Sequence, residues 1–147
     1  MKKVVIATHG RLADGFMSSL GLLGVDLSHV TALGYYDEAG ADIAAVDALF
    51  DELAAGDQLI VCSDVSFGSV SQAFARAAAA HPSCDCHLVS GINLPLLLDL
   101  CLSTEPVDSE QLAQTVAQAQ QQLSIVQPPA APAASASDDV FGGGDFF

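Results

Sequence analysis

The stretch VVIATHGRLADGF, residues 4–16, joins a continuous apolar run to the start of a helical pattern. Residues 3–8 are dominated by β-branched and other apolar side chains, which is typical of a strand buried on both faces. Apolar residues then recur at the spacing of a helix, at Leu12, Phe16, Leu20 and Leu23. The stretch therefore predicts a strand, a turn at His9 and a helix.

The same alternation of strands and helices continues along the chain. Further strands are predicted at 30–35, 58–64 and 86–92, with turn and cap residues at 37–40. Helices are predicted at 43–53, from about 68 to 80, at 94–102, and after Asp108. In the last helix, Asp108 and Gln111 form a capping-box pattern, and the apolar positions are Leu112, Val116 and Leu123. This order predicts an α/β fold, a three-layer sandwich around a mostly parallel central sheet with right-handed crossovers.

Charge limits the partners that the chain can have. Its 147 residues are enough for about one domain, and they carry 4 Lys and Arg against 18 Asp and Glu, a formal net charge of −14. Four basic residues can hardly form a positive patch, which disfavours nucleic acid and anionic membranes as partners. A basic protein surface is favoured, because opposite charge speeds encounter.

The spacing of the cysteines and the length of the apolar runs indicate the cellular compartment in which the protein works. Cys62, Cys84, Cys86 and Cys101 are irregularly spaced, and no apolar run approaches the roughly 20 residues of a membrane helix. We therefore expect a reduced, cytoplasmic protein. The cluster HPSCDCH, residues 81–87, contains soft ligands, but Cys86 and His87 would point to opposite faces of a strand, so we predict no metal site and no cofactor.

The composition changes at Pro128. We expect residues 1–126 to form the domain and residues 127–147, rich in Pro, Ala, Ser and Gly, to form a flexible tail. The tail ends in acidic and aromatic residues, at 138–147. This end is either a disordered terminus or a short peptide that docks into a groove of another protein.

Two residues stand where ligands bind in open parallel sheets, at the carboxyl ends of strands. His9 follows the first strand and Asp64 the third, and in the strand order 2-1-3-4 they would face each other. A carboxylate bonded to one imidazole nitrogen leaves the other nitrogen as a nucleophile or base. The alternative is that His9 only caps the helix or packs. His29 has no predicted role.

The residues around this pair favour a phosphoryl group. Thr8 and Gly10 flank the histidine, and Ser66, Gly68 and Ser69 lead into a helix whose first N–H groups attract anions. The chain has no phosphate-binding glycine motif for a nucleotide. A phosphoryl group would therefore have to come from another protein.

Three segments resemble, in order and spacing, signatures of the mannose-family enzyme IIA domains of the bacterial sugar phosphotransferase system: VVIATHG (4–10), LIVCSDVSFGSVSQAFAR (59–76) and VSGINLPLLLDLCL (89–102). The resemblance covers residues 2–125. It implies a phosphoryl carrier that receives the group from the phosphocarrier HPr on His9 and passes it to a IIB domain serving the membrane IIC and IID subunits. It also implies that Asp64 orients the ring and that Ser69 lies near the phosphoryl group.

The resemblance further implies a homodimer and a sheet in the order 2-1-3-4, often extended by an antiparallel strand near the C-terminal part. One departure concerns the loop after Asp64. The family commonly has Gly-Gly-Ser-Pro there, and this chain has Phe67-Gly68-Ser69-Val70. Two other functions stay open: the related phosphoryl donor subunit of dihydroxyacetone kinase, and a non-catalytic regulatory or binding module of the same fold.

Overall fold

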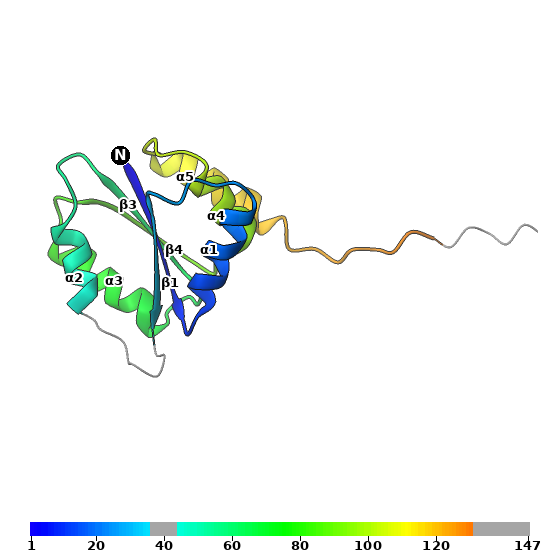
Figure 1. Cartoon of the computed structure of the whole chain (residues 1–147), viewed down its shortest axis with the longest axis horizontal. Helices are drawn as coiled ribbons and strands as arrows, with labels where there is room; N and C mark the ends of the chain where they lie inside the picture. The colour runs from blue at the N-terminus through cyan, green and yellow to red at the C-terminus, as the bar shows by residue number, and fades with distance from the viewer. Residues whose placement is uncertain (36–43, 131–147) are drawn as a thin grey trace, which may run out of the picture.

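The computed structural model describes residues 1–35 and 44–130. Strands and helices alternate through most of this part of the chain (Figure 1), and they are β1 (Lys2–His9), α1 (Leu12–Leu22), β2 (Val30–Tyr35), α2 (Ala44–Asp51), β3 (Gln58–Ser63), α3 (Ser69–Ala80), β4 (Asp85–Ser90), α4 (Leu94–Cys101) and α5 (Ser109–Gln120). The predicted turn at 37–40, the start of the helix predicted from 43 and the end of the tail lie outside the described residues.

The strands form one sheet in the order β2-β1-β3-β4, and every pairing is parallel. Strand β1 lies in the interior of the sheet, which explains why its residues 4–8 are almost completely buried. This confirms the predicted α/β fold and strand order. The antiparallel extension that the resemblance allowed is not found in residues 1–35 or 44–130.

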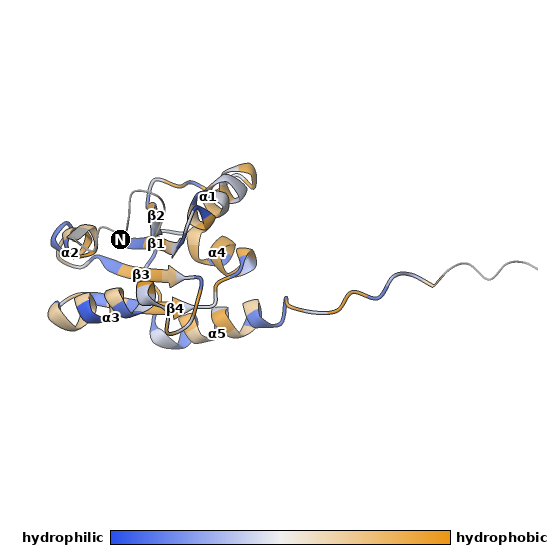
Figure 2. Ribbon diagram, turned by 90° about the horizontal axis from the view of Figure 1, so that it is seen from below, coloured by the Kyte–Doolittle hydropathy of each residue, from blue (hydrophilic) through white to orange (hydrophobic). Residues whose placement is uncertain are grey.

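Helices cover both faces of the sheet, α2 and α3 on one side and α1, α4 and α5 on the other (Figure 2). Alternate residues of β1 supply the two cores, because successive side chains of a strand point to opposite faces. Val4 and Ile6 pack with α1, α4 and α5, while Val5 and Ala7 pack with α2 and α3. The continuous apolar run of β1 is thus explained by burial on both sides.

The ends of two helices differ from the predicted patterns. Leu12 and Leu23 lie at the two ends of α1 and are exposed, so that Leu20 is the fully buried member of the predicted series. Helix α5 ends at Gln120, and the next turn is tightened, with the Leu123 N–H donating to the Gln120 carbonyl at 3.3 Å. Leu123 lies beyond the end of the helix and is exposed, so the apolar series predicted for this helix, Leu112, Val116 and Leu123, does not extend to Leu123.

Among the described residues, no helix has both the length and the apolar character needed to cross a membrane.

Candidate phosphoryl-transfer site

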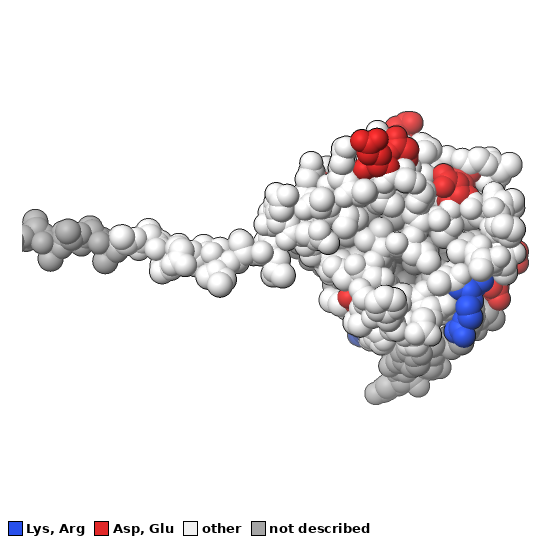
Figure 3. Space-filling view, turned by 180° about the vertical axis from the view of Figure 1, so that it is seen from behind, with Lys and Arg blue, Asp and Glu red and all other residues white. Residues whose placement is uncertain are grey.

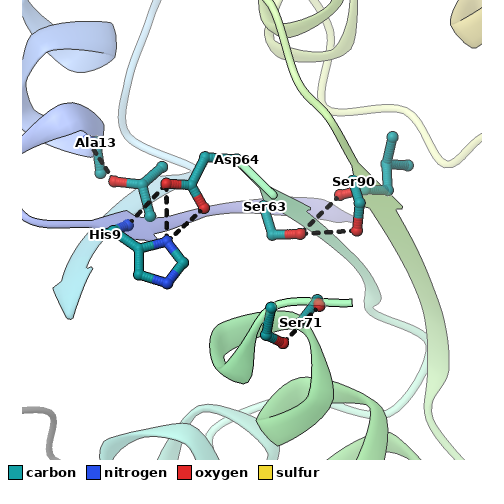
Figure 4. A network of polar contacts seen from close by, with 9 residues as sticks. His9, Ala13, Ser63, Asp64, Ser71 and Ser90 are labelled. Carbon is teal, nitrogen blue, oxygen red and sulfur yellow. Dashed lines mark hydrogen bonds and ion pairs between the residues drawn. The ribbon is translucent and has the colours of Figure 1, made fainter. Parts of the chain in front are cut away.

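The sheet topology brings His9 and Asp64 together at the carboxyl ends of two neighbouring strands, β1 and β3 (Figure 4). The Nδ1 atom of His9 lies 3.1 Å from each carboxylate oxygen of Asp64. The backbone N–H of His9 also donates to Oδ2 of Asp64 at 2.9 Å. The carboxylate therefore holds both the ring and the main chain of the same residue, which leaves the ring little rotational freedom.

The electrostatics of the pair determine where the ring proton lies. Burial alone would raise the pKa of Asp64, but the hydrogen bonds from the His9 backbone and ring, together with attraction to the ring, hold this pKa below its usual value. Asp64 is thus an ionised acceptor at neutral pH. Nδ1 of His9 must be the donor, and in the neutral ring the lone pair then belongs to Nε2.

The His9 and Asp64 side chains differ in their exposure to solvent. The Asp64 side chain is 12% exposed, whereas the His9 side chain is 40% exposed. Figure 4 shows the second nitrogen of the His9 ring pointing away from the carboxylate. The site therefore combines a largely buried carboxylate with a partly exposed imidazole ring at the rim of the sheet.

The start of α3 forms one wall of the site. Gly68 is the residue before α3, and a Cβ atom placed on it would lie 3.4 Å from Cε1 of His9 and 3.3 Å from the carbonyl oxygen of Val65. A side chain at this position would therefore crowd the Val65 carbonyl and contact the ring. No side chain of the described residues caps the first N–H groups of α3, so the positive end of this helix is available to an anion.

Ser66 and Ser69 are exposed on the loop and on the first residue of α3, so both hydroxyls lie on this side of the molecule. Gly10 turns the chain after His9 with a φ of 56°, which favours glycine. The predicted residues His9, Gly10, Asp64, Ser66, Gly68 and Ser69 thus lie on the rim formed by the loops that follow β1 and β3.

Thr8 lies differently from the other predicted site residues. Its side chain is fully buried, and its hydroxyl oxygen accepts a hydrogen bond from the Ala13 N–H at 2.8 Å, in the first turn of α1. Thr8 therefore fixes the direction in which the chain leaves the strand. Its contribution to the site is to hold the loop that carries His9.

Sequence reasoning missed Gly34. A Cβ atom at this position would lie 2.3 Å from the carbonyl oxygen of Gly10, in the turn after His9, and the Gly10 N–H donates to the Tyr35 carbonyl at 2.8 Å. Strand β2 thus packs directly against the turn that follows His9. The signal that could have revealed it is a glycine inside a strand pattern, which often marks a close approach of another backbone.

The cysteine and histidine cluster at 81–87 is divided among separate contacts. The His81 ring stacks on Phe50 at 5.0 Å between centroids, and Nε2 of His87 lies 3.0 Å from Asp85. All four cysteines are free, and burial raises the pKa of the Cys86 and Cys101 thiols to about 11. Within the described residues, no three His, Cys, Asp or Glu side chains gather in a way that could hold a metal ion.

Several solved structures with a similar fold are described as components of sugar phosphotransferase systems. A crystal structure from Klebsiella pneumoniae, described as a phosphoenolpyruvate-dependent sugar phosphotransferase system permease, shares 31% identity, covers 84% of this chain and 90% of its own, and has a TM-score of 0.73. A phosphotransferase system IIA protein associated with the fucose utilization operon of Streptococcus pneumoniae shares 26% identity, with coverages of 84% and 92% and a TM-score of 0.65.

The mannose/sorbose-specific IIA subunit from Enterococcus faecalis shares 20% identity, with coverages of 90% and 100% and a TM-score of 0.73, which supports the fold. The family model EIIA-man, described as the fructose IIA component of the phosphotransferase system, matches residues 3–120. This match spans every strand and helix described above, apart from Lys2, the first residue of β1. The chain therefore belongs to the EIIA-man family of phosphotransferase system IIA components.

Proposed function

We propose that this protein carries a phosphoryl group on Nε2 of His9, received from phosphorylated HPr and passed to a IIB domain that serves membrane IIC and IID subunits. The main support for the proposal is the contact of both Asp64 carboxylate oxygens with Nδ1 of His9, at 3.1 Å each, while the His9 side chain is 40% exposed. Family membership supports a role in sugar phosphotransfer.

In the transfer step, the lone pair of Nε2 attacks the phosphorus atom in line with the bond to the donor nitrogen. The new N–P bond forms as the donor's N–P bond breaks, and the donor imidazole leaves with the electron pair. The ring of His9 gains positive charge during this step, and ionised Asp64 stabilises that charge through the retained proton on Nδ1. Transfer to the IIB domain is the same reaction in the opposite direction.

The phosphoryl oxygens need donors that are already in place. The N–H groups at the start of α3, which no N-cap side chain bonds, and the exposed hydroxyls of Ser66 and Ser69 are suited to this role, because they belong to the loop and helix start that approach the His9 ring at Gly68. Gly10 and Thr8 support the opposite side of the loop. We further propose that the protein works in the cytoplasm as a homodimer.

The test is to incubate the protein with phosphoenolpyruvate, enzyme I and HPr, and to measure the intact mass. We expect one added phosphoryl group, lost in acid as expected for a phosphohistidine, and none in His9→Gln. The control His87→Gln should be labelled like the wild type, because His87 pairs with Asp85 on β4. Labelling of His9→Gln to the wild-type extent would refute the proposal.

A second measurement identifies the acceptor. The labelled protein should lose its phosphoryl group to a IIB protein and keep it in the presence of the nucleotide-bearing subunit of a dihydroxyacetone kinase. A label that remains stable with either acceptor would favour the regulatory module. Asp64→Asn should slow labelling by about tenfold or more, because the amide stabilises the charged ring less than a carboxylate does.

A further inference from the structure

Phe67, in the loop before α3, has an energetically unfavourable backbone conformation and an exposed aromatic side chain. Its φ is 58°, in the left-handed region, and it is the one residue other than glycine with a positive φ in the part of the chain that the structure describes. Its side chain is 91% exposed, and the other Phe and Tyr side chains of the described residues are at least partly buried. Bulky residues rarely adopt this backbone conformation, and such outliers concentrate at functional sites.

The loop holds Phe67 in this conformation through hydrogen bonds. The side-chain amide of Gln72, on α3, donates to the Phe67 carbonyl at 2.9 Å. The hydroxyl of Ser71 donates to the Gly68 carbonyl at 2.9 Å, and the Gly68 N–H donates to the Val65 carbonyl at 3.4 Å. These bonds hold the backbone around Phe67 in one conformation and leave its side chain in solvent.

The position of Phe67 relates it to the reactive ring. Its neighbour Gly68 lies against Cε1 of His9, so Phe67 is one residue away from the wall that contacts the partly exposed ring. Val65, on the same loop, is also exposed. We name Phe67 and Val65 the apolar rim. A protein surface that brings a phosphoryl group to His9 must approach across this rim.

We propose that Phe67 is a docking anchor that selects the phosphoryl donor protein, whose surface offers an apolar recess beside its own phosphoryl group. The proposal rests on the proposed function of His9. A small donor molecule could not bury so large an exposed ring, whereas an interface gains most from central aromatic residues. Unlike a IIB domain, the donor protein meets a His9 that carries no phosphoryl group, so the side chains around the ring carry more of the recognition in this encounter.

The decisive variant is Phe67→Gly. Glycine adopts a φ of 58° readily, so this change removes the ring and relieves the backbone at the same time, and the melting temperature should stay equal or rise. At HPr concentrations far below saturation, we expect the rate of labelling by phosphorylated HPr to fall by about thirtyfold, the usual minimum for an interface anchor. The small donor phosphoramidate, which needs no docking, should label His9 at the wild-type rate.

Two controls separate anchoring from general loss of apolar surface. Leu22→Ala removes a side chain that is 88% exposed at the far end of α1, and it should leave the rate unchanged. Phe67→Tyr keeps the ring and should retain most of the rate. Equal labelling of Phe67→Gly and wild type by phosphorylated HPr would overturn the inference, as would slowing that appears only in transfer to a IIB protein.

A failure of the proposed function gives a different result. In that case the wild type itself takes no phosphoryl group from phosphorylated HPr, although phosphoramidate still labels the ring, and both proposals fall. If the wild type is labelled normally and Phe67→Gly reacts slowly with phosphoramidate as well, Phe67 supports the ring and is not a docking anchor.

Discussion

The contact between His9 and Asp64 determines which ring nitrogen can react. The carboxylate lies at 3.1 Å from Nδ1 through both of its oxygens, so the ring cannot rotate without breaking two contacts, and the His9 backbone N–H holds the same carboxylate in place. This arrangement was predictable because His9 ends one strand and Asp64 directly follows another. The strand order then decides whether they meet, and that order depends on crossovers that the two residues do not encode.

The lowered pKa of Asp64 leads to a prediction about acid stability. Because the folded-state pKa lies below the ordinary value of 3.8, the ionised carboxylate contributes stability above about pH 4, and this contribution is lost as the pH falls through the folded pKa. Asp64→Asn should therefore be less stable than wild type at pH 7, and the difference should shrink between about pH 4 and pH 2.

Urea unfolding of both proteins across this range measures the difference. Asp14→Asn is a suitable control, because Asp14 is exposed on α1 and its effect on stability should be small at every pH. A gap between Asp64→Asn and wild type that stays constant down to pH 2 would contradict the assignment of an ionised acceptor.

Gly68 allows a test of ring position that is separate from the chemistry of the pair. In Gly68→Ala, the new methyl group would lie 3.3 Å from the Val65 carbonyl oxygen, a tight contact that the loop must relieve by a few tenths of an ångström, and 3.4 Å from Cε1 of His9, at the limit of ordinary van der Waals contact. We expect labelling by phosphorylated HPr to slow by about tenfold, since small misplacements of a nucleophile are costly. The loss of stability should stay below about 1 kcal/mol.

The matched control is Gly15→Ala on α1, where an added Cβ would have no atom within 4 Å. This variant should be labelled at the wild-type rate and gain about 0.5–1 kcal/mol in stability, because alanine favours the helix. Equal labelling rates for the two variants would show that the space beside Cε1 does not matter.

At the scale of elements, the alternation of apolar strands and helices was sufficient to predict the layers and the parallel sheet. The ends of elements were less predictable, because they depend on contacts between segments. Leu123 fits the helical spacing after Leu112, yet the helix stops at Gln120 and its last turn tightens. Thr8 has the residue type of a phosphoryl ligand, yet its hydroxyl oxygen is used by the first turn of α1.

The close approach of β2 to the turn after β1 leads to a prediction at this scale. In Gly34→Ala, the Cβ atom would be placed 2.3 Å from the Gly10 carbonyl oxygen, a backbone atom that moves only if the turn moves. We expect a loss of about 1–3 kcal/mol in the free energy of unfolding, as for other overpacked sites. Labelling of His9 should also slow, because the displaced turn carries the ring.

Gly21→Ala provides the comparison, because its Cβ would make an ordinary 3.7 Å contact with Leu27. Its stability and labelling rate should match or exceed those of the wild type. If denaturant unfolding of Gly34→Ala gave the wild-type midpoint, strand β2 would not be holding the turn in place.

For the whole molecule, the division between domain and tail can be tested by truncation. The side chains of Leu123, Ile125 and Val126 are exposed after α5, so the chain beyond this helix contributes little to the described cores. A protein ending at residue 126 should keep the melting temperature and the labelling rate of the full chain. A clear fall in either quantity would show that residues 127–147 belong to the folded unit or to the docking surface.

The net charge of −14 determines how the molecule meets its partner. On the face shown in Figure 3, acidic side chains gather toward the upper end of the view and basic ones are few. We expect a donor with a basic surface to be steered by this field, whereas the apolar rim acts only after contact. Raising the salt concentration from about 50 to 500 mM should therefore slow labelling by phosphorylated HPr several-fold, because screening shortens the reach of the field.

Phe67→Gly separates these two contributions. The variant keeps every charge, so its labelling rate should be lower than that of the wild type at each salt concentration, with the same relative decrease as salt is added. Stopped-flow or quenched-flow measurement of labelling at several salt concentrations gives both curves. A wild-type rate that does not change with salt would mean that the acidic surface takes no part in the encounter, and that recognition depends on the rim and the His9 site alone.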